Sequence, residues 1–186
     1  MNKHLSRSLS ALAMACAALS AQAGTVSAQA GVLVTLDHWA YGNGVGVQAT
    51  GYNGPAGGFG GALSGTTVFD TTSFLTYCIE LEEHFGFSRT PMTGYTVQEG
   101  GSYFARRRAD ASIADRLGQL WTWVSDHPAM VDTAAESASL QLAIWNLVYD
   151  TDFSVTVAHV FNDNSARRIQ ADALLVAEFA LDVEDE

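Results

Sequence analysis

After residue 23 the chain has no lysine, a single cysteine and only three prolines. One cysteine cannot form an internal disulfide, so the disulfide framework of many small secreted domains is excluded. No apolar run reaches the roughly 20 residues that a membrane-spanning helix needs. Seven arginines are set against twenty acidic residues in this part of the chain, a net charge of −13. This balance disfavours a nucleic-acid partner and an anionic membrane surface.

Residues 1–23 have the composition of a secretory signal peptide. Two basic residues precede a short apolar run, Leu9–Leu19, and the small-residue cleavage signal Ala21-Gln22-Ala23 follows it. The apolar run is too short to span a bilayer. We therefore expect cleavage before Gly24 and an exported product that is secreted or held at the cell surface, with the periplasm as a further possibility.

Removal of the signal peptide leaves Cys78 as the one cysteine of the chain. In an exported protein such a residue is a thiol, an intermolecular disulfide, or a cysteine masked by other chemistry. Cys16 lies within the predicted signal peptide. Lipid attachment at Cys16 is an alternative interpretation, although Ala13 occupies the position where a lipobox has leucine.

The remaining sequence predicts one α+β domain over residues 24–181, followed by an acidic tail over residues 182–186. We expect an antiparallel sheet, or a barrel-like arrangement of strands, in the N-terminal part and a helical part that carries Gln141. The predicted strands cover Gly31–His38, Val45–Ala49, Ala62–Phe69, Ser73–Leu81, Tyr95–Glu99 and Ser154–Phe161. The predicted helices run from Asp110 to before Pro128, over Thr133–Tyr149 and over Arg167–Leu181.

The segment between residues 42 and 65 contains ten glycines. The run Gly42-Asn43-Gly44-Val45-Gly46 lacks the spacing of a phosphate-binding loop, and no Lys-Ser or Lys-Thr pair follows it. We therefore interpret the segment as flexible turns between strands. A second connection is expected over Phe85–Gly94, because Pro91 and Gly94 interrupt regular structure.

The predicted helix over Thr133–Tyr149 holds a glutamine in an almost wholly apolar run. Thr133 and Glu136 have the spacing of a capping box. From Ala138 onward nearly every residue is apolar, so the helix should be covered on most sides. An amide buried there without partners costs roughly 1–3 kcal/mol. Gln141 is therefore either hydrogen-bonded by a neighbour or has reacted with one.

One possible reaction partner lies in the predicted strand that ends at Leu81. Strand alternation places Leu75, Tyr77, Ile79 and Leu81 on one face and Phe74, Thr76, Cys78 and Glu80 on the other. Cys78 would then share its face with a hydroxyl and a carboxylate. Such surroundings are typical of a cleft wall and not of a dry core.

The segments Tyr77-Cys78-Ile79-Glu80-Leu81 and, later, Leu140-Gln141-Leu142-Ala143-Ile144-Trp145 together resemble the Cys–Gln thioester domain of bacterial surface proteins. The resemblance is closest to the Gram-negative branch found among exported PEP-CTERM proteins. It implies that the Cys78 thiol condenses with the Gln141 amide, releasing ammonia and forming an internal thioester. Such a bond reacts once, so the resemblance implies a domain that binds its partner covalently and not an enzyme.

The family resemblance also implies a setting and a partner. An adhesin-like domain of this kind would bind covalently to an amine or hydroxyl on a surface protein or polysaccharide, at the cell surface or in a biofilm matrix. Glu80 is the first candidate to assist the reaction, since it shares the strand face of Cys78, and Tyr77 is the second. No cofactor or metal is implied.

The absence of lysine after residue 23 is compatible with this chemistry. Lysine amines are natural nucleophiles against a thioester, whereas guanidinium groups stay protonated and react poorly. A chain without lysine would not consume its own thioester. A general compositional bias toward arginine explains the same observation.

Two other functions remain open from the sequence. Cys78 could be the recurring nucleophile of an enzyme with a histidine base, for which the candidates are His38, His84, His127 and His159. Alternatively, Cys78 and Gln141 only pack, and the chain is a non-reactive structural or carbohydrate-contacting domain that uses Trp39, Trp121, Trp123 or Trp145. The oxygen-rich runs Asp150-Thr151-Asp152 and Asn162-Asp163-Asn164 lack the ligand spacing of a calcium loop, and turn chemistry explains them.

Overall fold

The computed structural model describes residues 32–49, 51–65, 71–81 and 86–150. Four sequence predictions lie outside these residues: the signal peptide, the strand over Ser154–Phe161, the helix over Arg167–Leu181 and the acidic tail.

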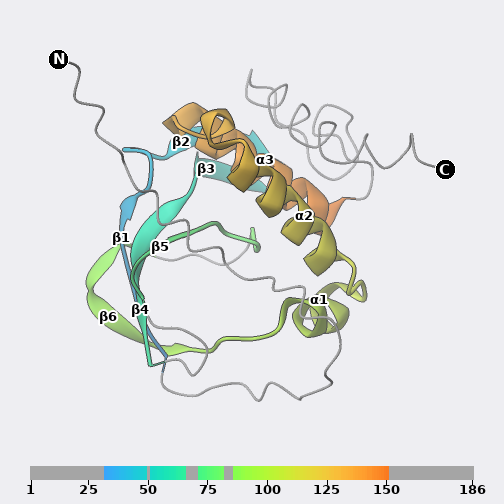
Figure 1. The fold of residues 1–186 in the computed structure, drawn as a ribbon, viewed down its shortest axis with the longest axis horizontal. Coiled ribbons are helices and arrows are strands. Elements are labelled where there is room, and N and C mark those ends of the chain that lie inside the picture. Colours follow the sequence, from blue (N-terminus) through green and yellow to red (C-terminus); the bar gives the residue numbers. More distant parts are fainter. Residues whose placement is uncertain (1–31, 50, 66–70, 82–85, 151–186) are drawn as a thin grey trace.

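Four strands form one antiparallel sheet and two more form a separate hairpin (Figure 1). The larger sheet has the order β5-β4-β1-β6, with strands β1 (Val32–Trp39), β4 (Phe59–Ser64), β5 (Thr71–Thr76) and β6 (Ser88–Tyr95). The hairpin pairs β2 (Val45–Ala49) with β3 (Tyr52–Ala56). Alternate residues of β1, Val32, Val34 and Leu36, are buried and form an apolar cluster with Phe59 of β4.

Three α-helices follow the strands in the described part of the chain: α1 (Gly100–Arg108), α2 (Ile113–Asp126) and α3 (Ala134–Tyr149). A short 3₁₀ turn, η1 (Pro128–Met130), joins α2 to α3. Helices α2 and α3 run side by side, α3 contacts the β2–β3 hairpin, and α1 contacts α2 (Figure 1). The predicted helix after Asp110 is therefore confirmed, and it ends before Pro128 as expected.

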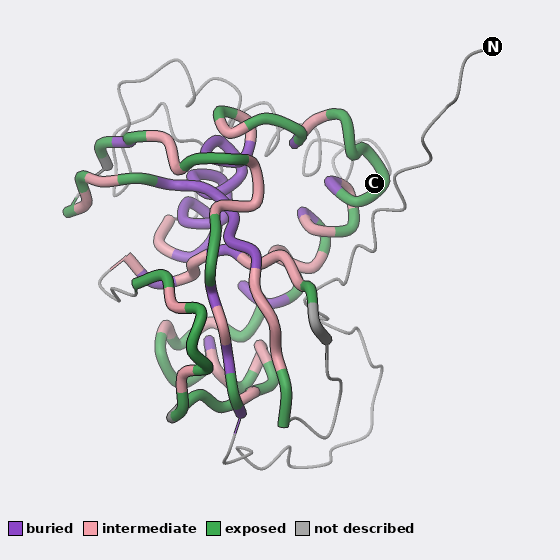
Figure 2. The backbone as a smooth tube through the Cα atoms, turned by 90° about the vertical axis from the view of Figure 1, so that its left-hand side faces the viewer, coloured by how far each residue is buried: buried purple, intermediate pink, exposed green. Residues whose placement is uncertain are grey.

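Helix α3 is the centre of the fold. Every residue from Ser137 to Val148 is buried, and this helix is coloured mostly purple, for buried residues, in Figure 2. At its start the Thr133 side chain accepts a hydrogen bond from the Glu136 N–H, and the Glu136 carboxylate accepts one from the Thr133 N–H. The predicted capping box and the predicted buried helix are both confirmed.

The strand predicted over Ser73–Leu81 is wrong at its C-terminal end. Strand β5 ends at Thr76, and residues 77–81 continue outside the sheet. The main-chain N–H groups of Cys78 and Leu81 donate to side chains of α3 and not to a neighbouring strand. Strand alternation therefore does not decide which way Tyr77, Cys78 and Glu80 face. The antiparallel pairing of β5 with the preceding strand is confirmed, although that strand, β4, begins before the predicted Ala62.

The connection predicted over Phe85–Gly94 is also wrong, because β6 occupies most of it. Pro91 has no main-chain N–H to donate, but it is tolerated in β6 because this strand lies at an edge of the sheet. The strand predicted over Tyr95–Glu99 is not formed: β6 ends at Tyr95. Within the glycine-rich segment, β2 matches its prediction, whereas β3 was not predicted.

Helix α1 begins where the sequence predicts only the end of a strand. The Glu99 carboxylate caps it by accepting hydrogen bonds from the N–H groups of Gly101 and Ser102, at 2.7 and 2.6 Å. The basic triplet Arg106-Arg107-Arg108 forms the last turn of this helix, where positive charge is favoured by the helix dipole.

The observed mixture of antiparallel sheets and helices confirms the α+β class. Within the residues described, the larger sheet is open, with β5 and β6 at its edges, so no closed barrel is seen. A search of the helices among these residues finds none with the length and apolar character required to cross a bilayer.

Candidate functional site

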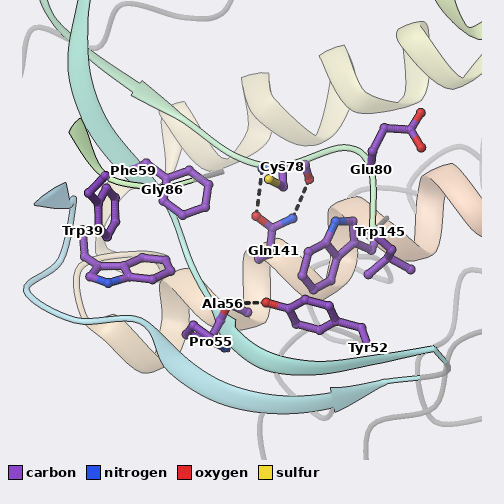
Figure 3. Close-up of a pocket in the computed structure, with 12 residues that line it drawn as sticks. Trp39, Tyr52, Pro55, Ala56, Phe59, Cys78, Glu80, Gly86, Gln141 and Trp145 are labelled. Carbon is purple, nitrogen blue, oxygen red and sulfur yellow. Dashed lines mark hydrogen bonds between the residues drawn. The ribbon is translucent and has the colours of Figure 1, made fainter. Parts of the chain in front are cut away.

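The side chain of Gln141 lies directly on the main chain of Cys78 (Figure 3). The Cys78 N–H donates to Gln141 Oε1 at 3.0 Å, and Gln141 Nε2 donates to the Cys78 carbonyl oxygen at 2.6 Å. Gln141 is only 1% exposed. The two residues, which are 63 positions apart in the sequence, are thus held together by both polar atoms of the amide.

The segment 77–81 lies along one ridge of α3. Ser137, Gln141 and Tyr149 are separated by four and eight positions, which places them on the same side of the helix. The Tyr77 hydroxyl hydrogen-bonds with Ser137 Oγ at 3.0 Å, Cys78 pairs with Gln141, and the Leu81 N–H donates to the Tyr149 hydroxyl oxygen at 2.9 Å. The three contacts follow the same order along the segment and along α3. They therefore fix which residue of the helix Cys78 faces.

Tyr77 reaches α3 one turn before Gln141. Ser137 also accepts a hydrogen bond from the Gly58 N–H at 2.8 Å, which ties the start of β4 to the same point. Burial raises the pKa of the Tyr77 phenol, and the Ser137 hydrogen bond opposes only part of that rise. The hydroxyl therefore stays protonated at physiological pH. Its partner is Ser137, and Tyr77 is not among the residues that line the pocket at Cys78.

Glu80 lines the same pocket as Cys78, but its carboxylate is engaged elsewhere. It accepts hydrogen bonds from the Tyr103 hydroxyl at 2.8 Å, the Tyr149 hydroxyl at 2.9 Å and the Arg108 guanidinium at 2.7 Å. In Figure 3 the carboxylate turns away from the Cys78–Gln141 pair. Cys78 and Glu80 line one pocket, but the strand face that the sequence predicts for them is not formed, since β5 ends at Thr76. The structure adds the partners of Glu80 on α1 and α3.

The pocket at the Cys78–Gln141 pair has a volume of about 350 Å³ and aromatic walls. Trp39 packs against Phe59 and Phe87, with ring centroids 4.9 and 5.2 Å away, and Tyr52 packs against Trp145 at 5.1 Å. In Figure 3 the pair lies between Trp39 with Phe59 on one side and Tyr52 with Trp145 on the other. Cys78 is half-buried at this position.

Tyr52 is the polar member of these walls. Its hydroxyl donates to the Pro55 carbonyl oxygen at 2.7 Å. Burial, and to a smaller extent the neighbouring Cys78, raise the pKa of Tyr52. The phenol therefore remains neutral, and the pocket gains no charge from it at physiological pH.

Several residues of the site were missed by sequence reasoning. Ser137 and Tyr149 carry a readable signal, since they are polar residues at helical spacing from Gln141 on an apolar helix. Phe59, Phe87 and Tyr52 carry no local signal, because only tertiary contacts bring them to the pocket at Cys78.

The tryptophans considered for carbohydrate contact separate into two groups. Trp39 and Trp145 line the pocket. Trp121 packs edge-on against Tyr77 at 5.9 Å, and Trp123 stacks on His127 at 4.4 Å. Only the first two could therefore meet a ligand at the Cys78–Gln141 pair.

The histidines of the described residues lie away from this pocket. His38 is exposed and contacts Asp37, and His127 is exposed and contacts the Trp123 carbonyl oxygen. Neither lines the pocket at Cys78, and His84 and His159 lie outside the residues described. Among the side chains that can be searched, no group of three or more metal-ligating residues is found.

Comparison of the chain with protein-family models, curated proteins and solved structures finds no match.

Proposed function

We propose that this chain is an exported bacterial surface or matrix-associated protein in which Cys78 and Gln141 form an internal thioester that captures a partner covalently. One observation carries the proposal. The Gln141 amide is held at 1% exposure by two hydrogen bonds to the residue whose thiol would attack it. Holding two reactants together in this way replaces a bimolecular encounter and can lower a barrier by several kcal/mol, of order 7–11 in the best cases.

The same hydrogen bonds suit the chemistry of thioester formation. The Cys78 sulfur attacks the Gln141 amide carbon, and negative charge develops on Oε1, which already accepts the Cys78 N–H at 3.0 Å. A donor already placed at this oxygen can stabilise the negative charge as it develops. The amide nitrogen takes the thiol proton and leaves as ammonia, so one C–S bond replaces one C–N bond.

Capture reverses the roles of sulfur and nitrogen. An amine or hydroxyl of the partner attacks the thioester carbonyl, its proton passes to the departing Cys78 sulfur, and an amide or ester to Gln141 remains. Until a partner is captured, the aromatic walls would limit the access of water to the thioester and so slow its hydrolysis. The lack of lysine after residue 23 removes the commonest internal nucleophile.

A non-reactive domain is the second candidate, and one observation favours it. Both polar atoms of the Gln141 amide have hydrogen-bond partners, so the residue is also explained as a core glutamine that fixes the segment 77–81. The pocket would then bind its ligand without a covalent bond, with Trp39 and Trp145 as stacking surfaces for a carbohydrate.

Methylamine separates the two candidates. If the thioester forms, methylamine treatment releases one thiol at Cys78 and attaches methylamine to Gln141, which peptide mass mapping locates. Cys78→Ser should incorporate none, because its hydroxyl is a poor substitute for the thiol. A wild-type protein whose Cys78 thiol titrates fully once the untreated protein is unfolded, and whose Gln141 stays unmodified, would contradict the proposal.

A further inference from the structure

Glu80 is the one charged residue that is buried in the described part of the chain, at 7% exposure. A carboxylate taken out of water is costly unless charged or hydrogen-bonding groups compensate it. Its compensation is extensive: both carboxylate oxygens accept hydrogen bonds, from Tyr103, Tyr149 and Arg108. The Arg107 guanidinium lies 3.8 Å away and adds a second positive charge.

These contacts join three parts of the fold. Tyr103 and Arg108 belong to α1, and Tyr149 is the last residue of α3. The Arg108 guanidinium also stacks over the Tyr149 ring at 4.0 Å from its centre. We call Glu80, Tyr103, Arg108 and Tyr149 the Glu80 clamp.

The Glu80 clamp bears directly on the position of Cys78. The Tyr149 hydroxyl donates to Glu80 and accepts from the Leu81 N–H, so it fixes the segment just after Cys78. The Tyr77–Ser137 hydrogen bond fixes the residue just before it. The Cys78–Gln141 pair therefore lies between two anchors on one helix.

We propose that Glu80 is a positioning residue for thioester formation, which acts through the clamp and transfers no proton. The inference rests on the proposed function of the Cys78–Gln141 pair. Two features of the geometry support it. The carboxylate turns away from the pair (Figure 3). Both of its oxygens accept hydrogen bonds from donors on α1 and α3. Because a shift of about 1 Å between reacting groups can slow a reaction about a hundredfold, anchors this close control the rate.

The test follows re-formation of the bond in the purified protein. Concentrated ammonia reopens a thioester to the thiol and the amide, and its removal allows the bond to form again. Intact mass against time then gives the rate at several pH values. We compare wild type with Glu80→Gln and Tyr149→Phe. The control is Asp37→Asn, which weakens the exposed Asp37–His38 contact on β1. Neither residue lines the pocket at Cys78 or belongs to the Glu80 clamp.

Positioning predicts that Glu80→Gln and Tyr149→Phe both slow re-formation at least about tenfold and leave the shape of the pH profile unchanged. Asp37→Asn should match wild type. A proton-transfer role predicts instead that Glu80→Gln loses one limb of the pH profile while Tyr149→Phe keeps the wild-type rate, and that result overturns the inference. Tyr149→Phe removes a single oxygen, so it serves as the test should Glu80→Gln fail to fold.

The outcomes also distinguish this inference from the proposed function. A wild-type protein that never loses ammonia refutes the thioester, and the positioning role fails with it. A wild-type protein that re-forms the bond, together with a Tyr149→Phe variant that does so equally fast, refutes the positioning role alone.

Discussion

Gln141 holds the main chain of Cys78, and this contact does not involve the Cys78 side chain. Substitution of either residue removes a thioester, but only substitution of Gln141 also removes the two hydrogen bonds. Gln141→Ala should therefore be less stable than Cys78→Ser by about 1–3 kcal/mol, since the Cys78 N–H and carbonyl lose their partners. Urea unfolding of the two variants measures the difference. Equal free energies of unfolding would mean that the hydrogen bonds of the Gln141 amide do not stabilise the fold.

The sequence predicts part of this residue-scale arrangement. A glutamine in a buried apolar helix needs a partner, and that requirement was correctly inferred. The partner is the main chain of Cys78, which leaves no trace in the sequence because every residue type carries the same N–H and carbonyl groups. The direction of the Glu80 carboxylate was equally hidden, since Tyr103 and Arg108 come from a helix that was not predicted.

At the scale of elements, the capping box of α3 supports the helix that presents Gln141. Thr133→Ala should lower the free energy of unfolding by about 1 kcal/mol, because the Glu136 N–H loses its acceptor. Thr122→Ala is the matched control, because the Thr122 hydroxyl lies on an exposed face of α2 and donates to the Gly118 carbonyl oxygen of its own helix. Thermal unfolding should show a loss for Thr133→Ala and a change within about 0.5 kcal/mol for the control.

Helix α1 depends on its glutamate cap. The hydrogen bonds of Glu99 with Ser102 and Gly101 lower the pKa of its carboxyl below the ordinary 4.5. A lowered folded-state pKa means that the stabilisation is complete above pH 4.5 and is lost as the pH falls through the folded-state value. Glu99→Gln should therefore be less stable than wild type at pH 7, and the gap should close under more acidic conditions. A gap that is constant between pH 7 and pH 3 would contradict this assignment.

Elements with strong local signals were predicted, and those that depend on tertiary contacts were not. The capping box and the apolar period identify α3 and α2. Helix α1 begins with Gly100-Gly101, which disfavour a helix, and its cap is a glutamate in place of the usual serine, threonine, aspartate or asparagine. Strand β5 ends early because α3 offers side-chain partners to residues 77–81, and periodicity cannot anticipate that competition.

At the scale of the whole molecule, a Cys78–Gln141 bond would join the end of β5 to the central helix across 63 residues. A cross-link of this span restricts the unfolded chain and stabilises the folded state by about 4 kcal/mol in the chain-entropy model. Methylamine should therefore lower the unfolding temperature of wild type as it opens the bond. The same treatment of Cys78→Ser, which has no bond to open, should leave its unfolding temperature unchanged.

The α+β class followed from the order of predicted elements along the chain. The arrangement of the sheet did not: the strand order β5-β4-β1-β6 and the separate β2–β3 hairpin depend on long-range pairing. That pairing also builds the aromatic pocket, since Trp39, Phe59 and Tyr52 come from three different strands. The sequence therefore predicts that Cys78 and Gln141 meet, but it does not predict the aromatic residues around them.

The intact mass of the purified protein tests the central claim most directly, with Cys78→Ala as its control. Thioester formation predicts that wild type is lighter than its sequence mass, counted from the observed N-terminus, by one ammonia. It also predicts that methylamine raises the wild-type mass by one methylamine, and that Cys78→Ala has its full sequence mass with or without methylamine. A wild-type protein with its full sequence mass and a titratable Cys78 thiol would contradict the claim and favour the non-reactive domain.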